Sequence, residues 1–183
     1  MNFIVLTGGT NRRFGSDKSE ALLGGKTLLE TLCGALPSGE LIIVGPESSV
    51  AAKYVREEPS YSGPVAAIGA GIAHCTAELV AIFATDMPFA PLLLPKLMAS
   101  LQSDAALPLD AEGIMQPLAG LYRRSALHQA LASYENLENQ SMKSLTSKLK
   151  IDEVSLVETE LLIDIDTPEA LSQAIALQSR LGL

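Results

Sequence analysis

A glycine-rich segment near the N-terminus contains the residues best suited to binding an anion. It reads LTGGTNRRFGSDK, from Leu6 to Lys18, and it follows a short apolar run. Gly8 and Gly9 would let backbone amides approach a phosphate closely, because neither residue has a Cβ atom. Arg13 offers a planar fork of donors, and Lys18 offers a mobile positive charge. The pattern G-G-x-x-x-R-x-G-x-D-K indicates either a phosphate-binding loop or a solvated polar turn with an ordinary ion pair.

Two better-known phosphate motifs do not explain this segment. A P-loop ending at Gly25-Lys26-Thr27 would need a glycine where the chain has Glu20. A dinucleotide-binding fingerprint at Gly69 and Gly71 would need a further glycine that the sequence lacks. These two glycines instead predict close packing of a helix against a sheet. The N-terminal segment is therefore a different arrangement from either motif.

A carboxylate follows the most apolar predicted strand. Asp86 comes directly after ELVAIFAT, where a hard cation bound to phosphates could lie. Mg²⁺ takes one or two protein carboxylates and leaves its other positions to water and phosphate. The alternative is a helix N-cap, in which Thr85 or Asp86 precedes a helix with Pro88 in its first turn. Both interpretations remain open from the sequence.

A second acidic pair, Asp164 and Asp166, lies in LLIDIDTPEAL at another predicted strand end. The pair could join Asp86 at a metal ion, or Asp166 could help to cap the last helix. His74 and His128 fall in helical patterns and have no partners at catalytic spacing. With no Ser-His-Asp or Cys-His set evident, covalent catalysis is not indicated.

Composition limits the possible partners. The chain has 183 residues, of which 48% are apolar and 19% charged, as in a globular protein. Its formal charge of −8 and its aromatic content of 4% argue against a nucleic-acid partner. The N-terminus lacks the features of a signal peptide, and the apolar segment 79–98 is interrupted by charges and prolines. We therefore predict no membrane partner. The two cysteines lack a metal or disulfide spacing, which predicts a cytoplasmic protein.

Predicted strands alternate with predicted helices along the whole chain. The strands are expected at 2–7, 40–44, 54–57, 79–84, 105–109, 116–122, 153–157 and 161–164, and the helices at 27–36, 65–74, 88–101, 125–133, 142–149 and from Pro168 onward, with Thr167 as N-cap. This alternation predicts one α/β domain, 1–183, with a mostly parallel sheet between helices. Ligands of such sheets lie beyond the carboxyl ends of the strands. The glycine-rich segment and Asp86 are therefore expected to share a site.

Several motifs together resemble a known family. LTGGTNRRFGSDK is similar to the N-terminal signature of the molybdenum cofactor guanylyltransferases, and LLGGKTLLE, GPVAAIGAGI, ATDMPF, QPLAGLY and DIDTPEAL follow in that family's order. The resemblance covers nearly the whole chain. The double glycine favours the guanylyl branch over the cytidylyl branch, whose loop usually reads AAG.

The resemblance implies a three-layer Rossmann-like nucleotidyltransferase fold and a Mg²⁺-dependent enzyme. GTP would donate GMP to the terminal phosphate of molybdopterin, in the form of its molybdenum cofactor, with release of pyrophosphate. Acceptor molybdoenzymes or their chaperones are possible further partners. A cytidylyl- or sugar-phosphate nucleotidyltransferase on the same fold, or a nucleotide-binding subunit without activity, remains the alternative.

The resemblance also implies roles for individual residues. Glu58 stands where the family often has an aspartate that contacts the nucleotide, and Asp166 stands where asparagine is common. Asp86 matches a residue that binds both Mg²⁺ and nucleotide. The expected catalytic residues are Arg13, Lys18 and Asp86; the expected nucleotide-binding residues are Leu6, Thr7, Gly8, Gly9, Lys18, Glu58 and Asp86; and the expected metal ligands are Asp86 and Asp166.

Overall fold

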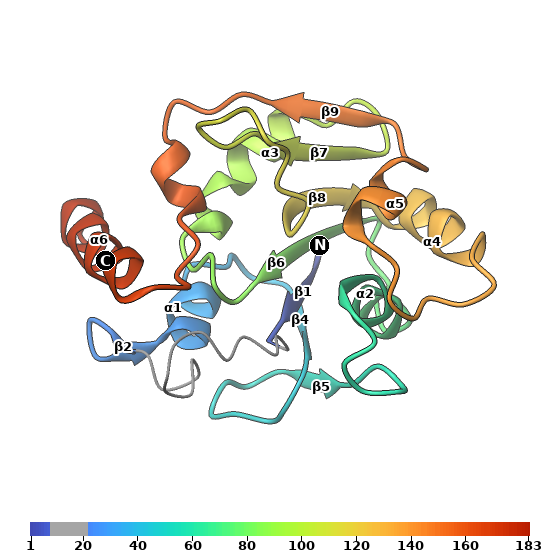
Figure 1. Cartoon of the computed structure of the whole chain (residues 1–183), viewed down its shortest axis with the longest axis horizontal. Coiled ribbons are helices and arrows are strands. Elements are labelled where there is room, and N and C mark those ends of the chain that lie inside the picture. Colours follow the sequence, from blue (N-terminus) through green and yellow to red (C-terminus); the bar gives the residue numbers. More distant parts are fainter. Residues whose placement is uncertain (8–21) are drawn as a thin grey trace.

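The computed structural model describes residues 1–7 and 22–183. The strands of its main sheet are β1 (Asn2–Leu6), β4 (Glu40–Val44), β5 (Lys53–Val55), β6 (Leu79–Ala84), β7 (Ala105–Pro108), β8 (Ala119–Arg123) and β9 (Ile151–Val154). Their order across the sheet is β5-β4-β1-β6-β8-β7-β9 (Figure 1). The N-terminal strand thus lies inside the sheet, with strands on both sides.

The strand directions bring the ends of the strands to one edge. β1 is parallel to β4 and β6, and Leu6 is in register with Val44 and Ala84. β5 is parallel to β4 and β9 is parallel to β7, whereas β8 is antiparallel to both of its neighbours. The carboxyl ends of the parallel strands therefore meet the start of β8. The mostly parallel sheet predicted from the sequence is confirmed.

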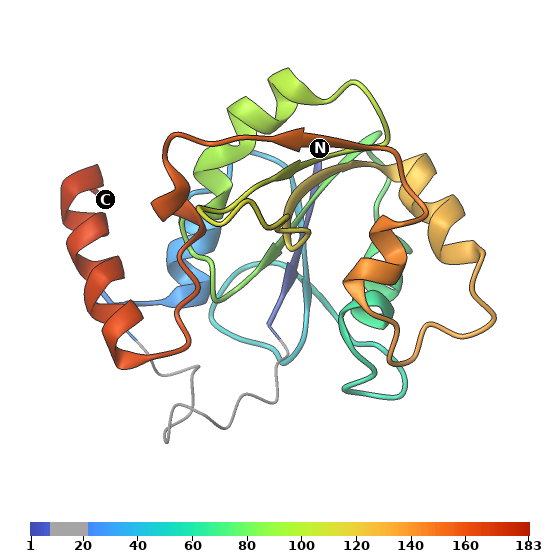
Figure 2. The same ribbon diagram turned by 45° about the horizontal axis from the view of Figure 1, so that its top comes forward.

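Helices cover both faces of the sheet. The core on one face includes residues of α1 (Leu28–Gly34), the 3₁₀ helix η3 (Ala90–Leu93), α3 (Leu94–Ser100), the 3₁₀ helix η4 (Thr159–Leu162) and α6 (Pro168–Leu181). The other face packs against α2 (Pro64–Ile72), α4 (Arg124–Ala132) and α5 (Met142–Thr146). Figures 1 and 2 show the resulting three layers. This is the predicted three-layer α/β architecture.

The sequence of β1 explains why two cores form. Phe3 and Val5 belong to the core under α1 and α3, whereas Ile4 and Leu6 belong to the core under α2. Alternate side chains of a strand point to opposite faces, so a strand that is apolar throughout is buried on both sides. Gly71 lets α2 approach closely, because a Cβ there would lie 2.9 Å from Ile4 Cγ2. The predicted close-packing role of this glycine is confirmed.

Local hydrogen bonds fix where two helices begin. The Thr27 side chain accepts from the Glu30 amide at 3.1 Å, and the Glu30 carboxylate accepts from the Thr27 amide at 2.8 Å. This capping box starts α1. Thr167 caps α6 by accepting from the Ala170 amide at 3.1 Å, which confirms the N-cap predicted from the sequence. Both helices are thus fixed at the positions where they join the rest of the fold.

Two local predictions differ from the structure. The sequence predicts a strand at 161–164, but Thr159–Leu162 forms η4. The Leu161 amide donates to the Glu158 carbonyl at 3.2 Å, as in a 3₁₀ turn. Leu161 and Leu162 are both buried, so the side chains do not alternate between buried and exposed. A small hairpin of β2 (Leu22–Leu23) and β3 (Lys26–Thr27) is not among the predicted elements. Its glycine turn has positive φ at Gly24 and Gly25, which is the usual signal for such a hairpin.

Within residues 1–7 and 22–183, no helix is both long and apolar enough to cross a bilayer.

Candidate active site

The ends of β1 and β6 are joined at the edge of the sheet. The Leu6 carbonyl accepts from the Thr85 amide at 3.1 Å and from the Thr85 hydroxyl at 2.8 Å. Asp86 follows immediately, and its carbonyl accepts from the Ile165 amide at 2.9 Å. Three segments far apart in the sequence therefore meet at the point where the chain leaves β1. Gly8, Gly9, Arg13 and Lys18 follow this point but lie outside the described residues.

Thr7 is held by the neighbouring strand. Its amide donates to the Val44 carbonyl at 3.1 Å, and its hydroxyl donates to the same oxygen at 3.2 Å. Gly45 lies against the Thr7 side chain and has φ +152°. A Cβ at Gly45 would overlap the Thr7 hydroxyl. The entry to the glycine-rich segment is thus fixed by the close approach of β1 and β4.

Asp86 is half-buried in the turn after β6. The following helix, η3, begins at Ala90, and its N-cap residue is Phe89, without a side-chain cap hydrogen bond. Neither Thr85 nor Asp86 is therefore the N-cap of that helix, so the capping interpretation is wrong. The Thr85 hydroxyl serves instead to join β6 to β1.

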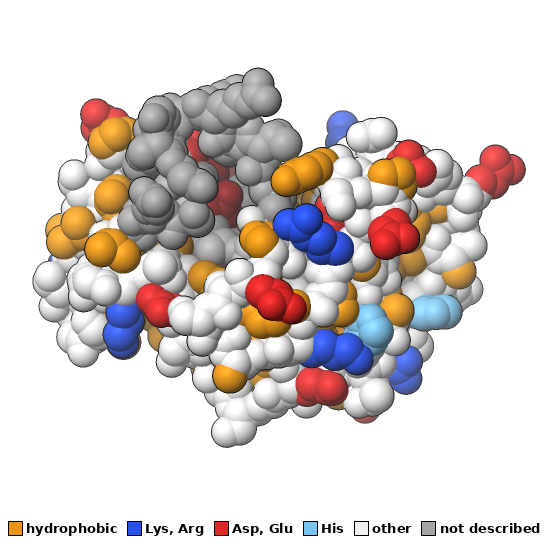
Figure 3. Space-filling model, turned by 90° about the horizontal axis from the view of Figure 1, so that it is seen from below, with side chains coloured by type: hydrophobic (Ala, Val, Ile, Leu, Met, Phe, Trp, Pro, Cys, Tyr) orange, Lys and Arg blue, Asp and Glu red, His pale blue; other side chains and the backbone are white. Residues whose placement is uncertain are grey.

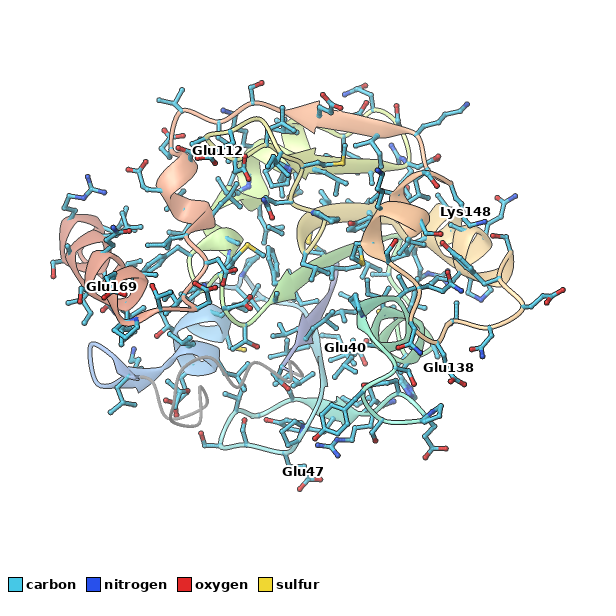
Figure 4. The ribbon with its side chains drawn as sticks, viewed as in Figure 1. Glu40, Glu47, Glu112, Glu138, Lys148 and Glu169 are labelled. Atoms are coloured by element: carbon cyan, nitrogen blue, oxygen red, sulfur yellow. The ribbon has the colours of Figure 1, made fainter. Side chains whose placement is uncertain are left out.

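An acidic cleft opens beside Asp86. It has a volume of about 790 Å³ and lies between the ends of β6 to β8, the helix η4 and α6. Its charged lining residues are Asp86, Asp110, Glu112, Glu160, Asp164 and Arg180. Arg180 forms an ion pair with Glu160 at 3.3 Å, and the other charged side chains of the described lining are all acidic. In Figure 4, Glu112 lies near η4, on the loop between β7 and β8.

Figure 3 views the molecule from the side of β5, and on the described part of that face acidic and basic side chains are interspersed. The cleft therefore differs from that face by having carboxylates from several separate elements on one concave surface. Such a surface favours cations and N–H donors over free phosphate groups.

Asp110 organises the loop between β7 and β8. Its Oδ1 accepts from the amides of Glu112 at 3.0 Å and Ile114 at 2.8 Å, and its Oδ2 accepts from Gln116 Nε2 at 2.7 Å. The Ile114 hydrogen bond, followed by those from Gln116 and Glu112, lowers the pKa of Asp110 below its ordinary value. Asp110 is not among the residues predicted from the sequence, although the QPLAGLY motif that starts at Gln116 marked the neighbourhood.

The structure separates the other predicted site residues from this cleft. Glu58 is exposed and lines a smaller hollow of about 240 Å³ with Arg56, Glu57 and Glu138. Figure 4 shows Glu138 beside α2, on the opposite side of the sheet from η4. Asp166 is half-buried and is absent from the lining of the acidic cleft, which contains Asp164 instead. The roles predicted for Glu58 and Asp166 stay predictions.

The comparison with known protein families decides the classification. Residues 3–154 match the family described as the MobA-like NTP transferase domain. The chain belongs to this family. It is therefore an NTP transferase by family, and the resemblance found in the sequence motifs is confirmed. The matched region ends with β9, so η4 and α6, which complete the acidic cleft, lie beyond it.

Relatives of this MobA-like chain have consistent names. A protein named "Probable molybdenum cofactor guanylyltransferase" from Mycobacterium avium is 32% identical over 192 residues, which cover 94% of this chain and 95% of the relative. A protein of the same name from a Nostoc species is 30% identical over 184 residues, covering 92% of this chain and 87% of the relative.

Solved structures agree on the fold. "Molybdopterin-guanine dinucleotide biosynthesis protein A" from Archaeoglobus fulgidus superposes with a TM-score of 0.76 at 23% identity, covering 98% of this chain and all of that one (100%). A nucleotidyl transferase from Methanothermobacter superposes with a TM-score of 0.77 at 17% identity, covering 98% of each chain. At these identities the likeness shows the fold alone, and that fold is the predicted nucleotidyltransferase type.

The described residues of this family member fit Mg²⁺ better than a metal held by protein alone. Within residues 1–7 and 22–183, no three His, Cys, Asp or Glu side chains are grouped to hold a metal ion. Mg²⁺ needs only one or two carboxylates when phosphates and waters complete its shell. Asp86 and Asp164 line the same cleft and are hard oxygen donors of the required type. The donor set thus fits a Mg²⁺ ion that arrives with a nucleotide.

Proposed function

We propose that this chain transfers GMP from GTP to the terminal phosphate of molybdopterin, as its molybdenum cofactor, with release of pyrophosphate. One observation carries the proposal: the Leu6 carbonyl is bonded to the Thr85 amide and hydroxyl. This joint places Asp86 next to the point where the G-G-x-x-x-R-x-G-x-D-K segment begins. The names of the relatives support the choice of donor and acceptor.

The reaction needs positioning more than a strong base. An oxygen of the acceptor phosphate forms a bond to the α-phosphorus of GTP, and the bond from that phosphorus to the bridging oxygen of pyrophosphate breaks. A phosphate monoester is already ionised near neutral pH, so it can attack without a general base. Catalysis then comes from orientation and charge neutralisation. In the described lining of the acidic cleft there is no histidine or cysteine, in keeping with this mechanism.

The thiols are unsuited to covalent catalysis. Burial raises the pKa of Cys33 and of Cys75 to about 11, so both remain protonated at neutral pH. Neither forms a disulfide. Neither cysteine is in the described lining of the acidic cleft, so neither is proposed as a nucleophile.

Each proposed residue has a distinct task. Arg13 and Lys18 bind the phosphates of GTP, and the backbone from Leu6 to Gly9 binds the nucleotide. Asp86 and Asp164, which line the same cleft, would hold Mg²⁺. The bound ion would neutralise phosphate charge in the transition state. Asp164 replaces Asp166 in this proposal, because Asp164 lines the cleft of Asp86.

Product formation with different nucleotides tests the proposal. With Mg²⁺ and acceptor present, we expect the guanine dinucleotide and pyrophosphate to form from GTP at least about tenfold faster than the corresponding products form from CTP; that factor is worth about 1.4 kcal/mol. Pyrophosphate release should depend on the acceptor. Equal rates with CTP would favour the cytidylyl alternative, and GTP binding without any release of pyrophosphate would favour a subunit without activity.

Gly45→Ala should weaken GTP binding about tenfold. The residue has φ +152°, where strain for a non-glycine residue is of the order of 1–3 kcal/mol, and its new Cβ would displace the Thr7 side chain. Because Thr7 belongs to the predicted nucleotide-binding segment, which begins at Leu6, the displacement should reach the rest of that segment. Equilibrium titration with GTP measures the effect. Gly34→Ala is the control, because a Cβ there meets nothing within 4 Å; equal GTP affinities for the two variants would contradict the prediction.

A further inference from the structure

The side-chain amide of Gln116 is held in one orientation. Gln116 lines the acidic cleft, and its Nε2 donates to Asp110 Oδ2 at 2.7 Å. An ionised carboxylate can only accept hydrogen bonds, so the nitrogen end of the amide must face Asp110. The other carboxylate oxygen, Oδ1, is already bound to two backbone amides of the same loop. Asp110 is therefore fixed to the loop, and Gln116 is fixed to Asp110.

This arrangement leaves the carbonyl oxygen of Gln116 available for recognition. Among the hydrogen bonds of residues 1–7 and 22–183, none is accepted by the Gln116 side-chain oxygen, and the residue is half-buried at the wall of the cleft. A half-buried amide oxygen in such a place gains from an N–H donor on a ligand. The orientation imposed by Asp110 thus commits the nitrogen end of the amide to Asp110 and leaves the side-chain oxygen as the end available to a ligand.

We propose that Gln116 accepts a hydrogen bond from the amino-substituted pterin ring of the acceptor, and that Asp110 is the positioning residue that fixes the Gln116 amide for this contact. The inference rests on the proposed function, since that function supplies the acceptor. Beyond that function, the inference names the pterin ring as the part of the acceptor bound at this wall of the cleft, and Gln116 and Asp110 as the residues responsible.

The charge of the cleft favours the ring over the phosphate of the acceptor. A pterin has an exocyclic amine and a ring N–H, both hydrogen-bond donors, whereas an ionised phosphate offers acceptors only. Glu112 lies on the loop that Asp110 organises, and it lines the cleft together with Gln116. Its carboxylate repels a free phosphate and accepts from N–H donors. The wall around Gln116 is therefore suited to the heterocycle of the acceptor.

Exchanging the charge between the two residues tests this inference. In Asp110→Asn, the two backbone N–H groups of the loop require an acceptor. The oxygen of the new side-chain amide must therefore face them, because its amino group would meet two other donors there. The amino group of the new side chain must then face Gln116, which has to turn its amide and present its own amino group to the cleft. We expect acceptor affinity to fall roughly tenfold, with GTP affinity unchanged within about twofold.

The double variant Asp110→Asn, Gln116→Glu should restore acceptor binding. A carboxylate at position 116 accepts from the amino group introduced at position 110 and again presents an oxygen to the cleft, with the net charge of the wild type. Gln116→Glu alone should bind the acceptor weakly, because two carboxylates would face each other. We therefore expect each single variant to lose about tenfold and the double variant to recover to within about threefold of wild type.

Acceptor affinity should be measured by titration with molybdopterin in the absence of GTP, and acceptor KM in its presence. Asp152→Asn is the matched control. Asp152 also accepts two backbone amides, those of Gln102 and Ser103, and these lower its pKa, but it lies outside the cleft. It should leave acceptor affinity unchanged.

The outcomes separate this inference from the function. If the wild type binds the acceptor but forms no dinucleotide, the proposed function fails, whereas the loss and rescue can still support the roles of Asp110 and Gln116. If the wild type is active and Asp110→Asn leaves acceptor affinity unchanged, or Gln116→Glu fails to rescue it, the inference is wrong. If the wild type does not bind the acceptor, both are wrong.

Discussion

Replacing Asp86 with alanine should lower kcat for GMP transfer roughly a hundredfold to a thousandfold. Asp86 is the half-buried carboxylate at the end of β6, joined through Thr85 to the end of β1. A group that stabilises charge only in the transition state typically contributes about 2.7–4 kcal/mol to catalysis. Because the effect is expected in the transition state, the affinity for GTP should fall much less than kcat. Steady-state kinetics with GTP and acceptor, beside GTP titration, measure both.

Four measurements distinguish this role from a structural one. Asp86→Asn keeps the size of the side chain and should lose nearly as much activity, and raised Mg²⁺ should restore only part of the activity of either variant. Glu135→Ala removes an exposed carboxylate after α4 and should leave kcat within about twofold. Thermal melts should show that the Asp86 variants are folded. A folded Asp86→Ala protein with near wild-type kcat would rule out the metal assignment.

Strands buried on both faces were the most predictable elements. β1 and β6 are uninterrupted apolar runs, and burial between two layers of helices leaves little room for another interpretation. The start of α6 was predictable because Thr167 and Pro168 are local signals for an N-cap and a first turn. The structure of segment 159–162 was not predictable, because two adjacent apolar residues such as Leu161 and Leu162 fit a buried strand and a buried 3₁₀ turn equally well. Only their packing in the core that includes α6 and η3 decides between the two.

The candidate site was predictable where it depends on strand ends. Asp86 follows a buried strand, and the ends of parallel strands share an edge, so its meeting with the end of β1 could be foreseen. The sequence could not show which of Asp164 and Asp166 lines the cleft, and the structure has Asp164 there. Between them, Ile165 is buried and bonded through its amide to the Asp86 carbonyl. This contact joins residues distant in sequence, and no local pattern encodes it.

Asp110 and Gln116 illustrate a different limit. Their hydrogen bonds are local in sequence, and an Asp side chain in a loop commonly accepts from backbone amides a few residues away. The sequence alone could therefore suggest a turn at Asp110. It could not show that this turn lies at the wall of a cleft formed also by η4 and α6, which come much later in the chain. Their significance arises only from the tertiary arrangement.

The acidic character of the protein makes the cations of the glycine-rich segment important for binding a triphosphate. The chain has a net charge of −8, and the cleft beside Asp86 adds carboxylates from several elements. A triphosphate will therefore not bind here through overall attraction. It requires local cations, and Arg13 and Lys18 are the cations that the motif places after β1. The site should depend strongly on individual positive charges.

Lys18→Ala should accordingly weaken GTP binding and slow GMP transfer together. A phosphate contact with a charged donor typically contributes about 1.5–3 kcal/mol, which corresponds to roughly a tenfold to hundredfold loss of affinity. The lysine meets phosphate charge in the ground state and in the transition state, so kcat/KM for GTP should fall by at least the same factor. This pattern is the reverse of that expected for Asp86, whose loss should change kcat far more than affinity. Titration with GTP and kinetics at saturating acceptor measure the two quantities.

Lys26→Ala provides the matched control. Lys26 is an exposed lysine in β3, and it occupies the lysine position of the incomplete P-loop pattern. Its loss removes the same charge from the N-terminal region, so it also reports how much of the effect is long-range attraction. We expect GTP affinity to change less than about twofold in Lys26→Ala, and we expect Lys18→Arg to retain part of the wild-type affinity, because it keeps the charge but changes its geometry. Equal losses in Lys18→Ala and Lys26→Ala would reduce the role of Lys18 to general electrostatics, and an unchanged GTP affinity in Lys18→Ala would remove it from the site.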